Sequence, residues 1–178
     1  MKKLKLFALL LFVYLVVAIP FSVMEVIPGF TSVRPISMLE PIFAVFFGIP
    51  GCWAMAAGNL AMDIIGDGVR WSSIAGFIAC FVGPFIIYTW AQRSKRPFSL
   101  REPRDLLTYV GLVLCCAVTQ AVIITPSVAA FYPDVDARLF ASTVLMNETL
   151  FPIVFGIPVI ILMQEELGML PLKERQSA

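Results

Sequence analysis

Long runs without charged residues constrain this chain more than any other sequence feature. Five runs are wholly or almost charge-free: 6–24, 41–62, 71–92, 106–133 and 139–164, the last interrupted only by Glu148. About 20 apolar residues in a helix cross the roughly 30 Å hydrocarbon core of a bilayer. Only 14% of the residues are charged, whereas soluble domains carry about a quarter. The sequence therefore predicts an integral membrane protein built from helices in a lipid bilayer.

The distribution of Lys and Arg sets the expected number of helices. Basic residues cluster at the N-terminus, in the loop 93–104 and at 173–175. Cytoplasmic loops of membrane proteins collect Lys and Arg, yet five spans would put the loop 93–104 on the opposite side from the N-terminus. If 35–66 instead enters the membrane and returns, ten of the thirteen basic residues share one side, and the others are Arg34, Arg70 and Arg138.

A Gly/Pro turn supplies the reversal that this topology needs. The sequence Gly48-Ile49-Pro50-Gly51 interrupts the apolar run, Pro35 can open the first arm, and Gly66-Asp67-Gly68 can end the second. Each arm then has about 14–16 residues, or roughly 21–24 Å, which is short of a full crossing. Such arms are allowed only where protein covers the freed backbone groups. Two short spans and a re-entrant hairpin both satisfy this pattern.

We predict an all-α integral membrane protein, a compact bundle of six transmembrane helices in a single domain (1–178), with both termini cytoplasmic. The second and third helices are short, and the expected ranges are 5–24, 35–48, 51–66, 71–92, 106–132 and 138–164. The first segment also looks like a signal peptide, with basic residues before an apolar stretch. Because no clear small-x-small cleavage site follows it, we expect this segment to be retained and to end or kink near Pro20.

Composition and missing motifs exclude several function classes. A net charge of +1 provides no cationic face for a nucleic acid. The chain has no His, which excludes a His-based triad, an HExxH site and a His-Cys zinc site. The four Cys residues lie in apolar runs without a CxxC motif, and no GxxxxGK[ST] phosphate loop or GxSxG elbow is present. We therefore expect no enzyme, no metal site and no cofactor.

Polar residues inside or beside the apolar segments are the candidate functional residues. An ionisable side chain at the bilayer centre costs on the order of 3 kcal/mol, so each one needs an explanation. The predicted topology gathers most of these residues toward the outer half of the bundle, where a cavity could capture a hydrophilic solute. The candidate substrate contacts are Arg34, Glu40, Asn59, Asp63, Trp71, Gln120, Asn147 and Glu148.

The carboxylates among these candidates have two explanations. Glu40 and Asp63 fit an internal ion pair with Arg34 or Arg138 as well as they fit a ligand contact. Glu148 lies ten residues past Arg138, roughly 15 Å along a helix. Because a purely structural charge at that depth is expensive, Glu148 favours a functional role.

Residues 33–68 resemble a known family. They contain an Arg-Pro pair at 34–35, the segment FGIPG at 47–51 and the segment GNLAMD at 58–63. This pattern resembles the substrate-binding S components of energy-coupling factor (ECF) transporters. The resemblance implies a small capture subunit in a prokaryotic plasma membrane, which binds a vitamin or related micronutrient from outside. It also implies partners, namely a transmembrane coupling protein and two ATPase subunits.

The same resemblance places the ligand site. In that family the site is formed by the loop between helices 1 and 2 and by the outer halves of helices 4 to 6, which correspond here to 25–37, 71–80, 119–132 and 138–148. Asn147 and Glu148 are candidate ligand contacts both because they are polar residues within an apolar segment and because the resemblance includes them. Two alternatives stay open: a self-sufficient small transporter or channel that uses intramembrane carboxylates, and a structural membrane subunit in which every buried charge is paired.

Overall fold

The computed structural model describes residues 2–27, 30–66, 68–94 and 98–177, and this part of the chain is almost entirely helical. Among these residues, four helices are long and apolar enough to cross a membrane: Lys2–Phe21, Trp71–Arg93, Pro103–Phe131 and Ala137–Glu165. Two shorter apolar helices are Pro35–Phe47 and Ile49–Ile65. This is the architecture of an all-α, multi-pass membrane protein.

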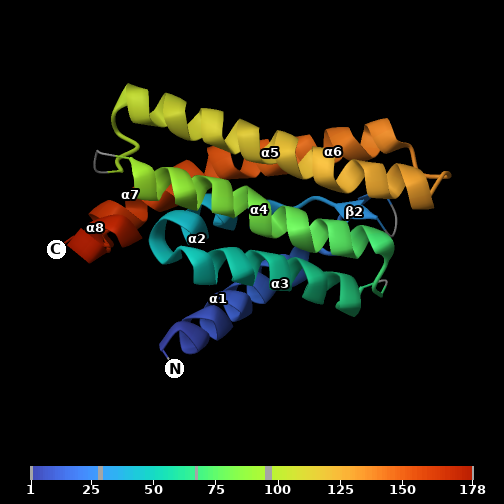
Figure 1. The fold of residues 1–178 in the computed structure, drawn as a ribbon, viewed down its shortest axis with the longest axis horizontal. Coiled ribbons are helices and arrows are strands. Elements are labelled where there is room, and N and C mark those ends of the chain that lie inside the picture. Colours follow the sequence, from blue (N-terminus) through green and yellow to red (C-terminus); the bar gives the residue numbers. More distant parts are fainter. Residues whose placement is uncertain (1, 28–29, 67, 95–97, 178) are drawn as a thin grey trace.

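The long helices pack side by side, and α4 contacts a neighbouring helix on each side. Helix α4 (Trp71–Arg93) packs against both α3 (Ile49–Ile65) and α5 (Pro103–Phe131), as Figure 1 shows. Helix α1 (Lys2–Ala18) crosses α3, and α6 (Ala137–Phe151) packs against α5. After α6 the chain makes a π-helical turn, Pro152–Gly156, and continues as α7, Ile157–Glu165.

The short helix α2 (Leu39–Phe47) lies in the interior of the bundle. It follows a 3-10 turn, η2 (Pro35–Met38), and every residue from Leu39 to Phe46 is buried. Its neighbours are α3, α4 and the π-helical turn. Because protein surrounds α2, this helix does not need to be long enough to cross a bilayer. Its ends are shielded from lipid, where unpaired backbone N–H and C=O groups would be costly.

The reversal predicted at Gly48–Gly51 occurs at Gly48. Helix α2 ends at Phe47, Gly48 has a φ of +64°, and α3 begins at Ile49. A positive φ favours glycine because a Cβ makes it strained. A Cβ on Gly48 would also come 2.5 Å from Leu172 Cδ2 and 3.1 Å from Tyr88 Cε2. Both backbone conformation and space therefore require glycine at this reversal.

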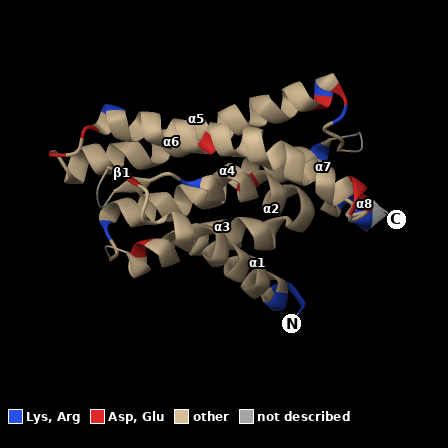
Figure 2. Ribbon diagram, turned by 180° about the vertical axis from the view of Figure 1, so that it is seen from behind, with Lys and Arg blue, Asp and Glu red and all other residues tan. Residues whose placement is uncertain are grey.

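The bundle has two ends of different character, and charged residues gather at them (Figure 2). The "basic end" contains the start of α1, the end of α4, the start of α5 and α8 (Leu172–Ser177), and both termini lie toward it in Figure 1. The basic residues placed there are Lys2, Lys3, Lys5, Arg93, Arg101, Arg104, Lys173 and Arg175. Lys95 and Arg96, predicted on the same side, lie outside the described residues.

The opposite "hairpin end" carries an antiparallel pair of short strands, β1 (Glu25–Ile27) and β2 (Thr31–Ser32). The pair lies between α1 and η2, and the loops before α4 and α6 are at the same end. Arg34, Arg70 and Arg138 belong to this half of the molecule. The separation of basic residues is the one that the sequence predicts, and the side of the membrane that each end faces stays a prediction.

Side chains from α8 cap helix termini at the basic end. The Arg175 guanidinium donates to the carbonyl oxygen of Phe46 near the end of α2, and Lys173 Nζ donates to that of Ser94 after α4. Cations beside the unpaired carbonyls of a helix C-terminus are stabilising. Residues 173–175 thus hold two helix ends that are distant in the sequence.

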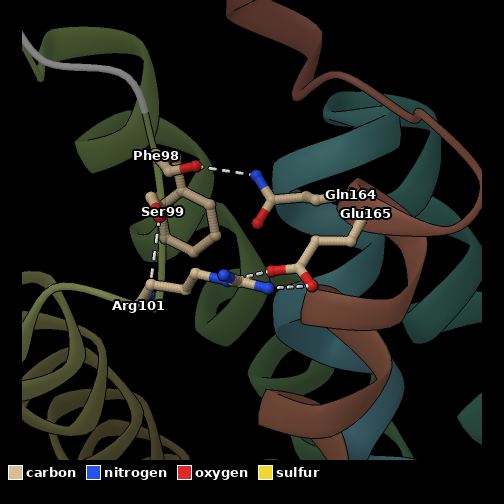
Figure 3. A network of polar contacts seen from close by, with 5 residues as sticks. All are labelled: Phe98, Ser99, Arg101, Gln164 and Glu165. Atoms are coloured by element: carbon tan, nitrogen blue, oxygen red, sulfur yellow. Dashed lines mark hydrogen bonds and ion pairs between the residues drawn. The ribbon is translucent and has the colours of Figure 1, made fainter.

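A polar network joins α7 to the segment before α5 (Figure 3). Gln164 Nε2 donates to the Phe98 carbonyl oxygen at 2.7 Å, and the Arg101 guanidinium pairs with the Glu165 carboxylate. The Ser99 hydroxyl accepts from the Arg101 backbone N–H at 3.4 Å. The hydrogen bond from Arg101 to Glu165 raises the pKa of the exposed guanidinium, which stays charged. The network fixes α7 at the basic end.

Two helices begin earlier in the sequence than predicted, because polar residues form their first turns. Helix α1 begins at Lys2 instead of 5, and α5 begins at Pro103 instead of 106, because proline suits a first helical turn and Asp105 favours a helix N-terminus. Helix α1 ends at Ala18 before a 3-10 turn that contains Pro20, as expected. The two strands, the π-helical turn and α8 were not predicted.

Substitution of Gly48 tests the reversal. We expect Gly48→Ala to lower the free energy of unfolding by more than about 1 kcal/mol, because alanine at a positive φ is strained and its methyl group meets Leu172. Thermal unfolding in detergent measures the effect. The control is Gly111→Ala in α5, where an added Cβ has open space, and where alanine should add about 0.5–1 kcal/mol. Equal effects of the two substitutions would contradict the conclusion that the reversal requires glycine at position 48.

Candidate functional site

A polar cavity of about 400 Å³ opens at the hairpin end of the bundle. Its walls come from the end of α1, the strand pair, the end of α3, the start of α4 and the inner face of α6. Three predicted site residues, Arg34, Asn59 and Asp63, line it. Other polar lining residues are Tyr14, Ser22, Glu25, Thr31, Ser32, Arg70, Ser72 and Ser73. The cavity lining therefore combines charged, amide and hydroxyl groups from several elements.

Arg34 in the cavity wall forms hydrogen bonds through both its side chain and its backbone. Its Nη2 donates to Asn59 Oδ1 at 2.6 Å and to the Tyr14 hydroxyl at 3.2 Å. Its backbone N–H donates to Asn147 Oδ1 at 3.2 Å, and Asn147 Nδ2 donates to the Ser32 carbonyl oxygen at 2.9 Å. These bonds fix the side chain between α1 and α3 and its backbone against α6.

The remaining donors of the Arg34 guanidinium are available to a ligand. Among the described residues, no acceptor forms a hydrogen bond with Arg34 Nε or Nη1. Neither nitrogen is among the buried polar atoms that lack a partner. Because the residue lines the cavity, these N–H groups can be reached from it. Guanidinium donors bind anionic and other acceptor groups more strongly than neutral donors do. The site thus offers a fixed, charged donor group to a solute.

A second polar cluster lies deeper in the bundle. Gln120 Nε2 on α5 donates to both carboxylate oxygens of Glu40 on α2, at 2.9 Å each. The Cys80 thiol donates to Gln120 Oε1 at 3.8 Å. Ser37 Oγ donates to Glu148 Oε1 at 2.8 Å, whereas Glu148 Oε2 is buried and has no hydrogen-bond partner among the described residues. These groups connect α2, α4, α5 and α6 through the core.

The structure brings most of the predicted site residues into these two groups. Arg34, Asn59 and Asp63 line the cavity, and Asn147 holds the backbone of Arg34. The deeper cluster contains Glu40, Gln120 and Glu148, and none of the three lines the cavity. Trp71 lies apart from both groups: its side chain is 62% exposed and stacks on Phe131 with 5.6 Å between ring centroids. A ligand role for each residue stays a prediction.

Sequence reasoning missed the hydroxyl groups that complete the network. Tyr14 is fully buried in α1 and accepts from Arg34, and Ser37 is the donor to Glu148. One signal was present for Tyr14: Gly58 faces its ring, and a Cβ on Gly58 would collide with that ring. A small residue on a helix marks a close approach, but the sequence does not name the side chain that approaches.

Neither polar group has the composition of a metal centre. Within the described residues, no three Cys, Asp or Glu side chains lie close enough together to hold an ion. Comparison of the chain with models of known protein families, with curated proteins and with solved structures gave no match. The fold and the site themselves define a helical membrane protein with a polar cavity at one end and a buried carboxylate cluster beyond it.

The bond between Gln120 and Glu40 can be tested by a double-mutant cycle. We expect Gln120→Leu to lower the free energy of unfolding by about 1–3 kcal/mol, because it removes the donor of a buried carboxylate. Adding Glu40→Leu should recover most of that loss, since replacing both partners of a buried pair can be nearly neutral. Denaturant unfolding in detergent measures each variant.

The control for this cycle is Val118→Ala, an exposed position on the same helix. It should change the unfolding free energy by less than about 0.5 kcal/mol. Additive effects of the Gln120 and Glu40 substitutions would show that the two side chains do not interact.

Proposed function

We propose that this chain is the substrate-binding membrane subunit of an ECF-type importer in a prokaryotic plasma membrane. The observation that carries the proposal is the polar cavity at the hairpin end, with a volume of about 400 Å³. Pockets for small molecules range over roughly 300–1,000 Å³, so the cavity matches a vitamin or a related micronutrient in size. The resemblance of residues 33–68 to S components supports the same assignment.

In this proposal the solute binds from the outer side, at the hairpin end. It enters beside the strand pair and meets the free donors of Arg34, with Asn59 and Asp63 on the adjoining wall of α3. Asn147 positions Arg34 through its backbone and does not touch the solute. The basic end then faces the cytoplasm, consistent with the accumulation of Lys and Arg on that side of membrane proteins.

Energy for transport comes from partner subunits in this proposal. The sequence has no GxxxxGK[ST] phosphate loop, which is the loop that cradles nucleotide phosphates in many ATPases. A transmembrane coupling protein and two ATPase subunits are therefore the proposed partners. The chain contributes selective capture, and no catalytic step is assigned to it.

Ligand identification is the direct test of the proposal. Protein purified alone in mild detergent should carry a co-purified micronutrient detectable by mass spectrometry, or should gain thermal stability with one member of a vitamin panel. At a ligand concentration 100 times Kd, binding adds about 2.7 kcal/mol to the stability of the folded state. An empty protein that no member of the panel stabilises would contradict the proposal.

Substitution of Arg34 tests which residue binds that ligand. We expect Arg34→Gln to weaken binding by about 10-fold or more, because a hydrogen bond from a charged donor contributes about 1.5–3 kcal/mol. The matched control is Arg138→Gln, an exposed arginine in the same half of the molecule that does not line the cavity. Titration calorimetry should give a Kd for the control equal to that of the wild type. An equal loss in both variants would place the ligand elsewhere.

A self-sufficient small transporter is a second candidate, and the buried carboxylates favour it. Ionisable residues within a membrane bundle commonly mark proton or cation pathways, and Glu148 is 4% exposed with one oxygen unpartnered among the described residues. Uptake into proteoliposomes that contain this chain alone, lost in Glu148→Gln, would support it. Uptake that requires added coupling protein and ATPases would instead support the ECF-type assignment.

A further inference from the structure

Glu40 and Glu148 bring two acidic side chains into one buried region. Glu40 is 3% exposed and Glu148 is 4% exposed, on α2 and α6 respectively. Ser37 Oγ donates to Glu148 Oε1 at 2.8 Å, and Glu40 follows Ser37 by three residues, so the two carboxyl groups lie in the same part of the core. Both also interact electrostatically with Arg34. Two carboxylates that share such a region repel each other strongly, because the low dielectric of the interior screens them poorly.

Neither carboxyl group has a cation bonded to it. Among the described residues, neither Glu40 nor Glu148 forms an ion pair, and the guanidinium of Arg34 bonds instead to Tyr14 and Asn59. A buried ionised carboxylate without a paired cation is costly, and such groups usually become neutral by binding a proton.

The hydrogen bonds point to the same conclusion. Both oxygens of Glu40 accept from Gln120, but within the described part of the chain Glu148 Oε2 accepts no hydrogen bond although it is buried. A buried carboxylate oxygen that accepts no hydrogen bond from protein makes the ionised form of the acid costly. The unpartnered oxygen therefore favours the neutral acid, because protonation removes the charge that lacks a donor.

We propose that Glu40 and Glu148 form a proton-binding site that holds one proton between them, with the charge of Arg34 balanced by the remaining carboxylate. With both acids ionised, the cluster and Arg34 together would carry a net negative charge. With both acids protonated, Arg34 would be left unbalanced. One shared proton makes the group neutral. Because interacting carboxyl groups titrate as a pair, the proton belongs to the pair and not to one residue.

The other titratable groups around the pair do not change this balance. Those that interact with Glu40 or Glu148 are Tyr14 on α1, Cys52 on α3, Cys80 on α4 and Cys116 on α5. All four side chains are neutral when protonated, which is their ordinary state near neutral pH. Asp63, at the hairpin end of α3, interacts with Cys80 and has a polar interaction of its own. Among the residues that the structure describes, Arg34 is therefore the cation that acts on both acids.

The site is connected to the cavity wall through adjacent residues of α6. Asn147 accepts from the backbone of Arg34, and Glu148 follows it in the chain. Loss of the proton would add a negative charge behind the wall that presents the Arg34 donors. That charge would weaken the attraction of the cavity for an anionic group, so the proton occupancy and the affinity of the cavity are coupled.

Infrared difference spectroscopy in lipid bilayers tests the proposal directly. At neutral pH, the wild type should show the carbonyl stretch of one protonated carboxylic acid, identified by its shift in D2O. Exposed acids are ionised at this pH and do not contribute. Glu40→Gln and Glu148→Gln should each abolish the band, because the remaining acid ionises to balance Arg34. Arg34→Gln should increase the band about twofold, because no cation then stabilises a carboxylate.

The matched control is Glu166→Gln, an exposed glutamate at the basic end, which should leave the band unchanged. Absence of the band in the wild type would overturn the proposal. Persistence of the band in either single glutamine variant would assign the proton to one acid alone and would overturn the shared site. The wild-type spectrum needs no variant, so the proposal stays testable if a variant fails to fold. The readout involves no solute and is independent of the proposed function.

Discussion

The bonds made by Arg34 hold together segments that are far apart in the sequence. Its side chain joins Tyr14 of α1 to Asn59 of α3, and its backbone N–H binds Asn147 of α6. A guanidinium keeps its charge under all ordinary conditions, so in a low-dielectric interior it must keep its acceptors. Three helices are thereby fixed around the strand pair, and the shape of the cavity depends on this one residue.

The position of α2 extends the same logic to the whole bundle. A short helix surrounded by protein lets the chain bring Glu40 into the core beside Gln120 of α5. In a lipid-facing helix this carboxyl group would have no donors. The long helices therefore surround the short helix α2, which carries a polar residue into the core, as expected for polar residues inside membranes.

Patterns that depend on local composition predicted the scaffold well. Hydropathy gave the long helices, and the Gly/Pro cluster gave the reversal, which the structure places at Gly48. The sequence could predict Arg34, Asn59 and Asp63 as site residues, because polar side chains in or beside apolar helices are energetically unfavourable and commonly have a function. Trp71 was proposed on its position alone, and the structure places it outside both polar groups.

Features that depend on tertiary contacts could not be predicted. Tyr14 has an ordinary position in an apolar helix, and nothing local indicates that it meets Arg34. The strands β1 and β2 have three and two residues, too few to show an alternating pattern. Helix α8 is polar, so its sequence does not indicate that it packs on the bundle. Its position depends on hydrogen bonds from Lys173 and Arg175 to the carbonyl oxygens of Ser94 and Phe46.

The caps made by α8 have a consequence for biogenesis. The Phe46 carbonyl is separated by 129 residues from the arginine that binds it. During synthesis, α2 and α3 leave the ribosome long before Arg175 exists, so the turn at Gly48 must persist in the membrane with one end uncapped. The contact that caps α2 therefore forms only after the described apolar helices have been synthesised. The contacts at the basic end are completed by a segment that is translated after the described apolar helices.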